Sequence, residues 1–139
     1  MKKYLSLFIF FILITITLFG SSQSFYGSNG ENLGRVEDDG TIRNSNGSSI
    51  GKIDKDGVVR NSNGAQIGKI DSDGTIRDRS NSTIGKVDSD GTVRNKDNAS
   101  IGRIDKDGTV RDANGAQIGR VGSIDPKLAA VIFFMKLFN

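Results

Sequence analysis

A pattern of alternating apolar and polar positions repeats every seventeen residues between residues 33 and 117. Apolar residues occupy positions one, four and ten of each copy, as Ile50, Ile53 and Val59 do in the second. Three such residues bury too little surface to offset the entropy of ordering seventeen residues, so the copies must fold together. No insertion or deletion separates the five copies, which start at Leu33, Ile50, Ile67, Ile84 and Ile101, and a partial sixth runs from Ile118 to Val121.

Each copy carries two turn signals. Asp-Gly at positions seven and eight favours a hairpin turn, because these residues tolerate positive φ. Position fifteen is always Gly or Asn, the residues that most readily enter the left-handed region. The Gly of the first turn is Gly40, Gly57, Gly74, Gly91 and Gly108, and the second turn has Gly47, Gly64, Asn81, Asn98 and Gly115.

Short segments rich in β-formers lie between these turns, such as Thr41 to Asn44 and Ile50 to Asp54. The second type of segment has Gly at position two, as at Gly51. A Gly inside a strand marks a bend or a close backbone approach. We expect the strand to bend there, so that its first half pairs with the preceding strand and its second half with the following one.

The N-terminal residues have the three parts of a secretory signal peptide. Lys2 and Lys3 precede an apolar stretch over residues 4–19, and small residues follow it. The sequence predicts a signal peptide over residues 1–22, cleaved after Ser22 or Ser24. The alternative is a membrane anchor through residues 4–19, although sixteen residues are short for a bilayer.

The C-terminal residues predict an apolar helix. Asp125 can cap its first turn and Pro126 suits the first helical position. Residues 128–138 are apolar almost all round except for Lys136, and they are too few to span a membrane. We expect this tail, residues 122–139, to pack on the repeats. Insertion into a membrane surface, or a terminal strand instead of a helix, is the alternative.

Composition excludes several kinds of site. The chain has no Cys and no His, which removes disulfides, thiolate sites and the commonest general base. Residues 33–117 carry fourteen basic and fourteen acidic side chains and no aromatic one, which argues against nucleic-acid binding. The paired carboxylates sit in repeated turns rather than in one distinct place. We therefore expect no enzyme activity, no catalytic residue and no cofactor.

The acidic turns resemble the start of a calcium-binding loop, but their spacing departs from it. Counted from Asp54, the Gly is at position four, whereas the calcium-binding loop has it at position six. Position twelve is Ala65, which cannot bind a metal ion. We favour turn formation as the role of these carboxylates over calcium binding. The candidate ligands are Asp54, Asp56, Asp71, Asp73, Asp88, Asp90, Asp105 and Asp107.

Position eleven is Arg in every copy, and position five is always acidic. Across the Asp-Gly turn these two side chains can form a cross-strand ion pair, which is the interpretation we favour. The alternative is an anion-binding ring of Arg side chains on the axis, formed by Arg43, Arg60, Arg77, Arg94 and Arg111.

Five copies of I-G-x-I-D-x-D-G-x-V-R, joined by Asn or Gly turns and followed by a Phe-rich tail, resemble the five-fold β-flower proteins. The resemblance covers about residues 33 to 138. It implies an all-β, pseudo-five-fold, propeller-like ring of five β-hairpin petals in an exported bacterial protein, with the apolar tail packed on it. It implies no catalytic residue. We assign residues 23–32 to a linker and residues 33–121 to the ring, which the sixth partial copy can close by pairing with the first repeat. An open β-solenoid is the structural alternative.

The sequence thus predicts an exported structural or interaction module in the periplasm, at the cell surface or outside the cell. Its partner is a protein or surface ligand that the sequence does not identify. Two alternatives remain: a calcium- or anion-binding module, and a membrane-associated protein held by its apolar termini.

Overall fold

The structure is a computed structural model that describes residues 22–138, so the expected signal peptide lies outside the described residues except for Ser22. The described chain contains short strands followed by one helix. These elements are β1 (Gln23–Gly27), β2 (Asn32–Val36), β3 (Thr41–Asn44), β4 (Ser49–Ile53), β5 (Val58–Asn61), β6 (Gln66–Ile70), β7 (Thr75–Asp78), β8 (Thr83–Val87), β9 (Thr92–Asn95), β10 (Ser100–Ile104), β11 (Thr109–Asp112), β12 (Gln117–Val121) and α2 (Pro126–Phe133).

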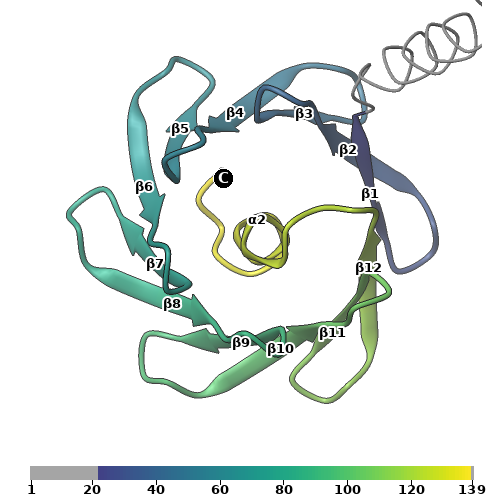
Figure 1. The fold of residues 1–139 in the computed structure, drawn as a ribbon. Helices are drawn as coiled ribbons and strands as arrows, with labels where there is room; N and C mark the ends of the chain where they lie inside the picture. Colours follow the sequence, from purple (N-terminus) through teal and green to yellow (C-terminus); the bar gives the residue numbers. More distant parts are fainter. Residues whose placement is uncertain (1–21, 139) are drawn as a thin grey trace, which may run out of the picture.

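The strands form one closed antiparallel ring, in which each strand pairs with its neighbours in sequence and β12 pairs with β1. Figure 1 shows the ring along its axis, with the hairpins β1–β2, β3–β4, β5–β6, β7–β8, β9–β10 and β11–β12 projecting outward as petals. The predicted closed ring of hairpin repeats is confirmed. It contains six petals, because the five complete repeats supply β2 to β11 and the flanking segments add one strand each.

Residues 23–27, which the sequence analysis assigned to a linker, close the ring as β1. Phe25 pairs with Gly34 on one side and with Val121 on the other. Phe25 thus takes position ten of a sixth unit that is split between the two ends of the repeat region. The partial copy at residues 118–121 therefore pairs with β1 rather than with the first complete repeat. Sequence inspection missed β1 because Phe25 and Tyr26 replace the usual Ile-Arg or Val-Arg pair.

Both turn signals form turns, but they tolerate different residues. The Gly at position eight has positive φ, as at Gly74 (φ 92°), and a side chain there would collide with the backbone oxygen of Val87. Position fifteen also has positive φ, but a side chain at Gly64 would enter open space. This explains why Asn81 and Asn98, both at φ 67°, replace Gly at position fifteen and never at position eight.

The second strand of each petal contains a β-bulge at position one. In β4, Gly51 pairs with Ile42 and Ser49 pairs with Arg43, so Ile50 has no direct partner. Gly51 also pairs with Asn61 on the following strand. Gly51 and Lys52 pair with both neighbouring strands, so the expected division of the strand between its two neighbours holds only in part. The bulge increases the local bend and twist.

Positions four and ten line the inside of the ring. Ile53 and Val59 pair across the Asp-Gly turn, and both are buried. All the position-ten residues of the complete repeats are fully buried: Ile42, Val59, Ile76, Val93 and Val110. Position one is only half-buried against this core and Leu33 is exposed, so the expectation that it belongs to the buried set holds only in part.

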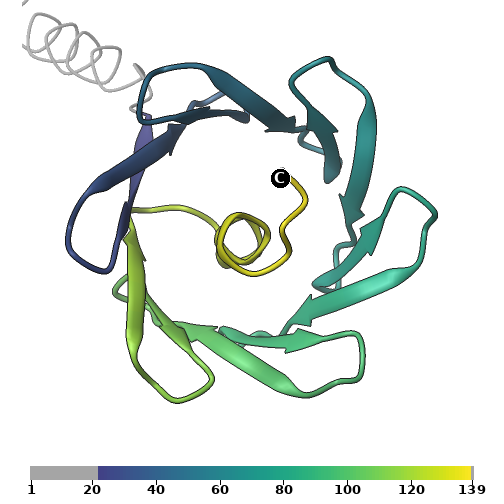
Figure 2. The same cartoon turned by 180° about the vertical axis from the view of Figure 1, so that it is seen from behind.

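The C-terminal tail fills the middle of the ring (Figures 1 and 2), as the sequence analysis expected. The side chain of Asp125 caps α2 by accepting a hydrogen bond from the Lys127 N–H at 2.8 Å, and Pro126 begins the helix. Ala129, Ala130 and Val131 are fully buried at the centre. The helix ends at Phe133, earlier than the apolar stretch does, because the residues after it spread over successive petals.

The tail, residues 122–139, is called the plug. In five of the six petals, one apolar side chain of the plug covers the position-two Gly. The tail passes around the inner wall, so that consecutive side chains meet consecutive petals. The pairs are Phe133 on Gly119, Phe134 on Gly102, Met135 on Gly85, Leu137 on Gly68 and Phe138 on Gly51. The remaining Gly34 lies against Phe25 from β1. Lys136 has positive φ (51°) and is exposed, so it turns the chain between Met135 and Leu137.

We predict that Gly74→Ala lowers the free energy of unfolding by at least about 2 kcal/mol, because it adds backbone strain and a contact with the Val87 oxygen. Gly64→Asn should cost less than about 1 kcal/mol, since Asn already occupies this position in two repeats. Urea unfolding of both variants tests this. Equal losses would contradict the distinction between the two turns.

We also predict that Phe134→Ala lowers the free energy of unfolding by about 2–4 kcal/mol, because it leaves a void over Gly102. The matched control is Lys136→Asn, which removes an exposed side chain at a positive φ that Asn tolerates and should be nearly neutral. Thermal melts of the two variants provide the comparison, and an unaffected Phe134→Ala ring would rule out a structural role for the plug at this petal.

Candidate interaction surface

The Asp-Gly turns form one edge of the ring, here called the turn rim (residues 37–40, 54–57, 71–74, 88–91 and 105–108). In the third turn, Gly74 N donates to Asp71 O at 3.0 Å and Asp71 N donates to Thr75 O at 2.8 Å. The carboxylate of Asp73 accepts from the Thr75 N–H at 2.9 Å. The carboxylate of position seven is thus used inside its own turn.

These hydrogen bonds change the acidity of the exposed turn carboxylates. The Thr75 backbone N–H, aided by the Thr75 hydroxyl, lowers the pKa of Asp73 below its ordinary value of 3.8. The cations Lys86 and Arg77 act in the same direction. The same causes lower the pKa of the carboxyls at the matching positions, Asp39, Asp90 and Asp107.

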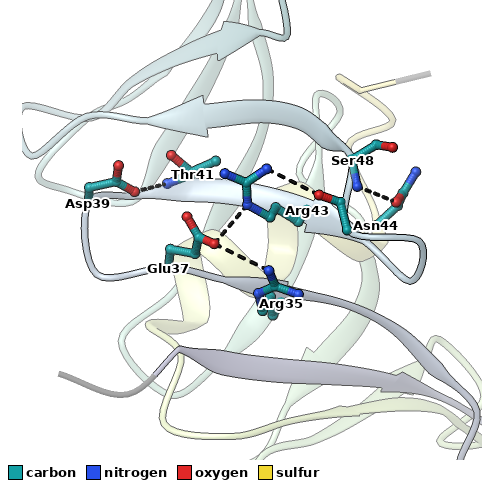
Figure 3. A network of polar contacts seen from close by, with 8 residues as sticks. Arg35, Glu37, Asp39, Thr41, Arg43, Asn44 and Ser48 are labelled. Atoms are coloured by element: carbon teal, nitrogen blue, oxygen red, sulfur yellow. Dashed lines mark hydrogen bonds and ion pairs between the residues drawn. The ribbon is translucent and has the colours of Figure 1, made fainter.

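Each Arg at position eleven binds the carboxylate at position five of its own repeat. Arg77 Nε donates to Asp71 Oδ2 at 2.8 Å, and Arg77 Nη1 donates to the backbone oxygen of Asn81 at 3.3 Å. Figure 3 shows the first repeat, where Glu37 Oε1 accepts from Arg43 Nε at 2.7 Å and from Arg35 at 3.4 Å. The same ion pair joins Arg60 to Asp54, Arg94 to Asp88 and Arg111 to Asp105.

The eight candidate calcium ligands therefore already have partners within their own repeats. Position five accepts from Arg: Asp54, Asp71, Asp88 and Asp105. Position seven accepts from a backbone N–H: Asp56, Asp73, Asp90 and Asp107. Within residues 22–138, no group of three or more acidic side chains could hold a metal ion.

The five Arg side chains do not meet on the ring axis. Arg77 follows Ile76, whose side chain points into the core, so Arg77 lies on the outer face. The middle of the ring is filled by α2 and the tail. The structure thus places Arg43, Arg60, Arg77, Arg94 and Arg111 around the outside, each with its own carboxylate, and replaces the axial anion ring with separate ion pairs.

Sequence reasoning overlooked a second set of cations, at position three. Lys69 pairs directly with Arg77 across the strands, so two positive side chains stand opposite each other on the outer face. The same register opposes Arg35 and Arg43, Lys52 and Arg60, Lys86 and Arg94, and Arg103 and Arg111. Position three is Lys or Arg in every copy, which was the available signal. The cation band is the set of position-three side chains: Arg35, Lys52, Lys69, Lys86, Arg103 and Arg120.

Shallow grooves surround the start of α2 at the turn rim. One of about 540 Å³ lies between Asp90, Asp105, Lys106 and Asp125. A second of about 390 Å³ lies between Asp56, Asp71 and Lys127. These grooves are lined by turn carboxylates, backbone groups and the serines Ser72, Ser89 and Ser123.

Side-chain to backbone hydrogen bonds hold the outer loops of the petals. The side-chain oxygen of Asn61 accepts from the N–H groups of Asn63 and Ala65, both at 3.0 Å. The equivalent positions Asn44, Asp78, Asn95 and Asp112 make the same pair of bonds. Every complete repeat therefore presents nearly the same loop backbone.

These features define an all-β closed ring of hairpin petals with an apolar C-terminal plug. A family model described as "5-fold beta-flower protein" matches residues 22–137, and the chain belongs to this family. The comparisons with curated proteins and with solved structures gave no match. The family match begins at residue 22 and therefore includes β1, in agreement with its role in closing the ring.

The lowered pKa values predict loss of stability in acid. Because the folded pKa lies below that of the unfolded chain, the charged turns stabilise the ring above about pH 4 and lose this contribution as the pH falls further. The triple variant Asp73→Asn, Asp90→Asn and Asp107→Asn keeps an acceptor but cannot titrate. We expect a smaller fall in melting temperature between about pH 6 and pH 3 than in the parent.

Asp97→Asn provides the control, since Asp97 lies in an outer loop and its carboxylate accepts no hydrogen bond from residues 22–138. This variant should retain the parent's acid sensitivity. An identical pH dependence in the triple variant and in Asp97→Asn would show that the turn carboxylates are not responsible.

Proposed function

We propose that this chain is an exported, non-enzymatic interaction module that meets its partner with the outer surface of the ring. The observation that carries this proposal is that the interior is occupied by the chain's own tail. Val131 of the tail is fully buried there, as are wall residues such as Ile42 and Ile76. The equivalent petals then remain as the surface that a partner can reach.

The hydrogen bonds that hold the petal loops support a binding role. Their loops are held by side-chain to backbone hydrogen bonds, and Arg at position eleven ties each loop to its strand. A surface that is already ordered loses little conformational entropy when it binds. Repeated petals can also engage a repeated ligand at several points, which raises the overall affinity.

The hydrogen bonds of β1 favour cleavage of the expected signal peptide after Ser22 over cleavage after Ser24. The Gln23 side-chain oxygen accepts from Ser123 N at 3.2 Å, and the Ser24 backbone oxygen accepts from Gly122 N at 3.3 Å. Cleavage after Ser24 would remove both acceptors from the junction that closes the ring, whereas cleavage after Ser22 leaves β1 complete. None of the helices within residues 22–138 has the length and apolar character needed to cross a membrane.

The proposal is tested by binding to cells that produce the protein. The processed chain, purified from the exported fraction and labelled with a fluorophore, should bind intact cells saturably, and an excess of unlabelled chain should compete. Mass spectrometry of the same material should give Gln23 as the first residue. Uptake that is linear with concentration and not competed would contradict an interaction module, and retention of residues 1–22 in a membrane fraction would favour anchoring.

A further inference from the structure

The cation band places two positive side chains in direct opposition on the outer wall of five petals. On the petal walls, Lys52, Lys69 and Lys86 each stand directly opposite an Arg. Like charges in direct opposition across strands are destabilising. The arrangement recurs in five petals, because the register and the residue type repeat together. A polar uncharged residue at position three would fit the same exposed site without the repulsion.

The acidic side chains offset this pattern mainly at the Arg of each pair, whereas a position-three cation such as Lys86 acts on a turn carboxylate, Asp73, without forming an ion pair within 4 Å. Position five neutralises the Arg at position eleven, for example Asp88 with Arg94 at 2.8 Å. Position seven lies in the turn, where Asp90 accepts from the Thr92 N–H. Acids are thus concentrated at the turn rim while cations encircle the outer wall, even though residues 33–117 are neutral overall.

Most position-three cations remain available to a partner. Lys69, Lys86, Arg103 and Arg120 are exposed, and Arg35 and Lys52 are half-buried. Arg35 and Arg103 share the carboxylates of Glu37 and Asp105, at 3.4 and 3.2 Å. For Lys52, Lys69, Lys86 and Arg120, no ion pair within 4 Å is present among residues 22–138. The band therefore carries regularly placed positive charge around the ring.

We propose that the cation band binds a linear anionic polysaccharide that follows the outside of the ring. This proposal rests on the proposed function, in which the outer surface is the binding surface. Sulfate, carboxylate or phosphate groups spaced along the polymer pair with Lys and with the free face of the Arg guanidinium groups. Because the petals are equivalent, a polymer of repeating charge meets the same contact at each one.

The aromatic content of the band favours a polysaccharide over a single-stranded nucleic acid. Proteins that bind single strands stack bases on exposed aromatic side chains. On the outer wall of the described strands, Tyr26 is the one aromatic residue, opposite Arg120 in the petal that closes the ring. The other described aromatic residues, Phe25, Phe133, Phe134 and Phe138, belong to the core or to the plug. Because Tyr26 is the one residue on this wall on which a base could stack, the outer surface favours contacts with charged groups over contacts with bases.

The experiment measures binding of the full processed chain to a heparin oligosaccharide by calorimetry at several salt concentrations, with neutral dextran as the uncharged probe. We expect binding that weakens as salt rises and no heat with dextran. The triple variant Lys52→Gln, Lys69→Gln and Lys86→Gln should weaken heparin binding by about tenfold and reduce the salt dependence. Its melting temperature should stay close to the parent's, because the variant removes both the opposition of each lysine to an Arg and the attraction of Lys52 and Lys86 to a turn carboxylate.

The matched control removes the same charge elsewhere. Lys55→Gln, Lys96→Gln and Lys106→Gln change exposed lysines in the turns and in one outer loop, outside the band. This triple should bind heparin within about twofold of the parent, as should the charge-preserving triple Lys52→Arg, Lys69→Arg and Lys86→Arg. Equal losses in the two glutamine triples would show that net charge alone acts, and would overturn the assignment to the band.

Three further outcomes contradict the proposal. Absence of heparin binding, while the labelled chain still binds cells saturably, would remove the polysaccharide and leave the interaction module standing. Single-stranded DNA of matched charge that binds more tightly than heparin would show that the choice of partner is wrong. Failure of both heparin and cell binding would remove the proposed function as well.

Discussion

The burial of apolar side chains at the centre of the ring is the constraint on which the rest of the structure depends. Each repeat contributes two inward residues and one Gly, as in Ile70, Ile76 and Gly68, and none of these can be sheltered within a single petal. Shelter comes from the neighbouring petals and from the tail. Closure by β1 and β12 removes the exposed strand edges that an open array would have.

Two contacts explain why glycine occupies position two throughout, since a side chain there would meet both a backbone oxygen of the neighbouring strand, such as Arg77 O at Gly68, and an apolar side chain of the tail or of Phe25. The missing side chain leaves room for one apolar residue of the tail at each petal, from Phe133 on Gly119 to Phe138 on Gly51. The sixth place is taken by Phe25, which lies in β1 and not in the tail. The two chain ends therefore complete a core that the five complete repeats alone leave unfilled.

The tail occupies the interior of the ring, and the charged side chains at positions three and eleven lie on the outer surface. The strand register determines how these charges are arranged there. Alternation sends positions four and ten inward and positions three and eleven outward. The same register that builds the apolar wall therefore sets Lys52 against Arg60 and aligns the ion pair between Arg60 and Asp54. Fold and surface charge follow from one repeat, which is why the petals present nearly equivalent outer surfaces.

The sequence by itself determined the repeat length, both turns, the ion pair across the Asp-Gly turn and the helix start at Asp125, because each depends on residues close together in the chain. It also identified the tail as a partner for the repeats, because so apolar a segment must be covered. Only the tertiary structure decided that residues 23–27 form a strand, since Phe25 acts through pairing with Val121, far away in sequence. It likewise decided that the Arg side chains point outward and that the cations at position three face them. These are consequences of ring closure and inter-strand register, which short-range patterns do not specify.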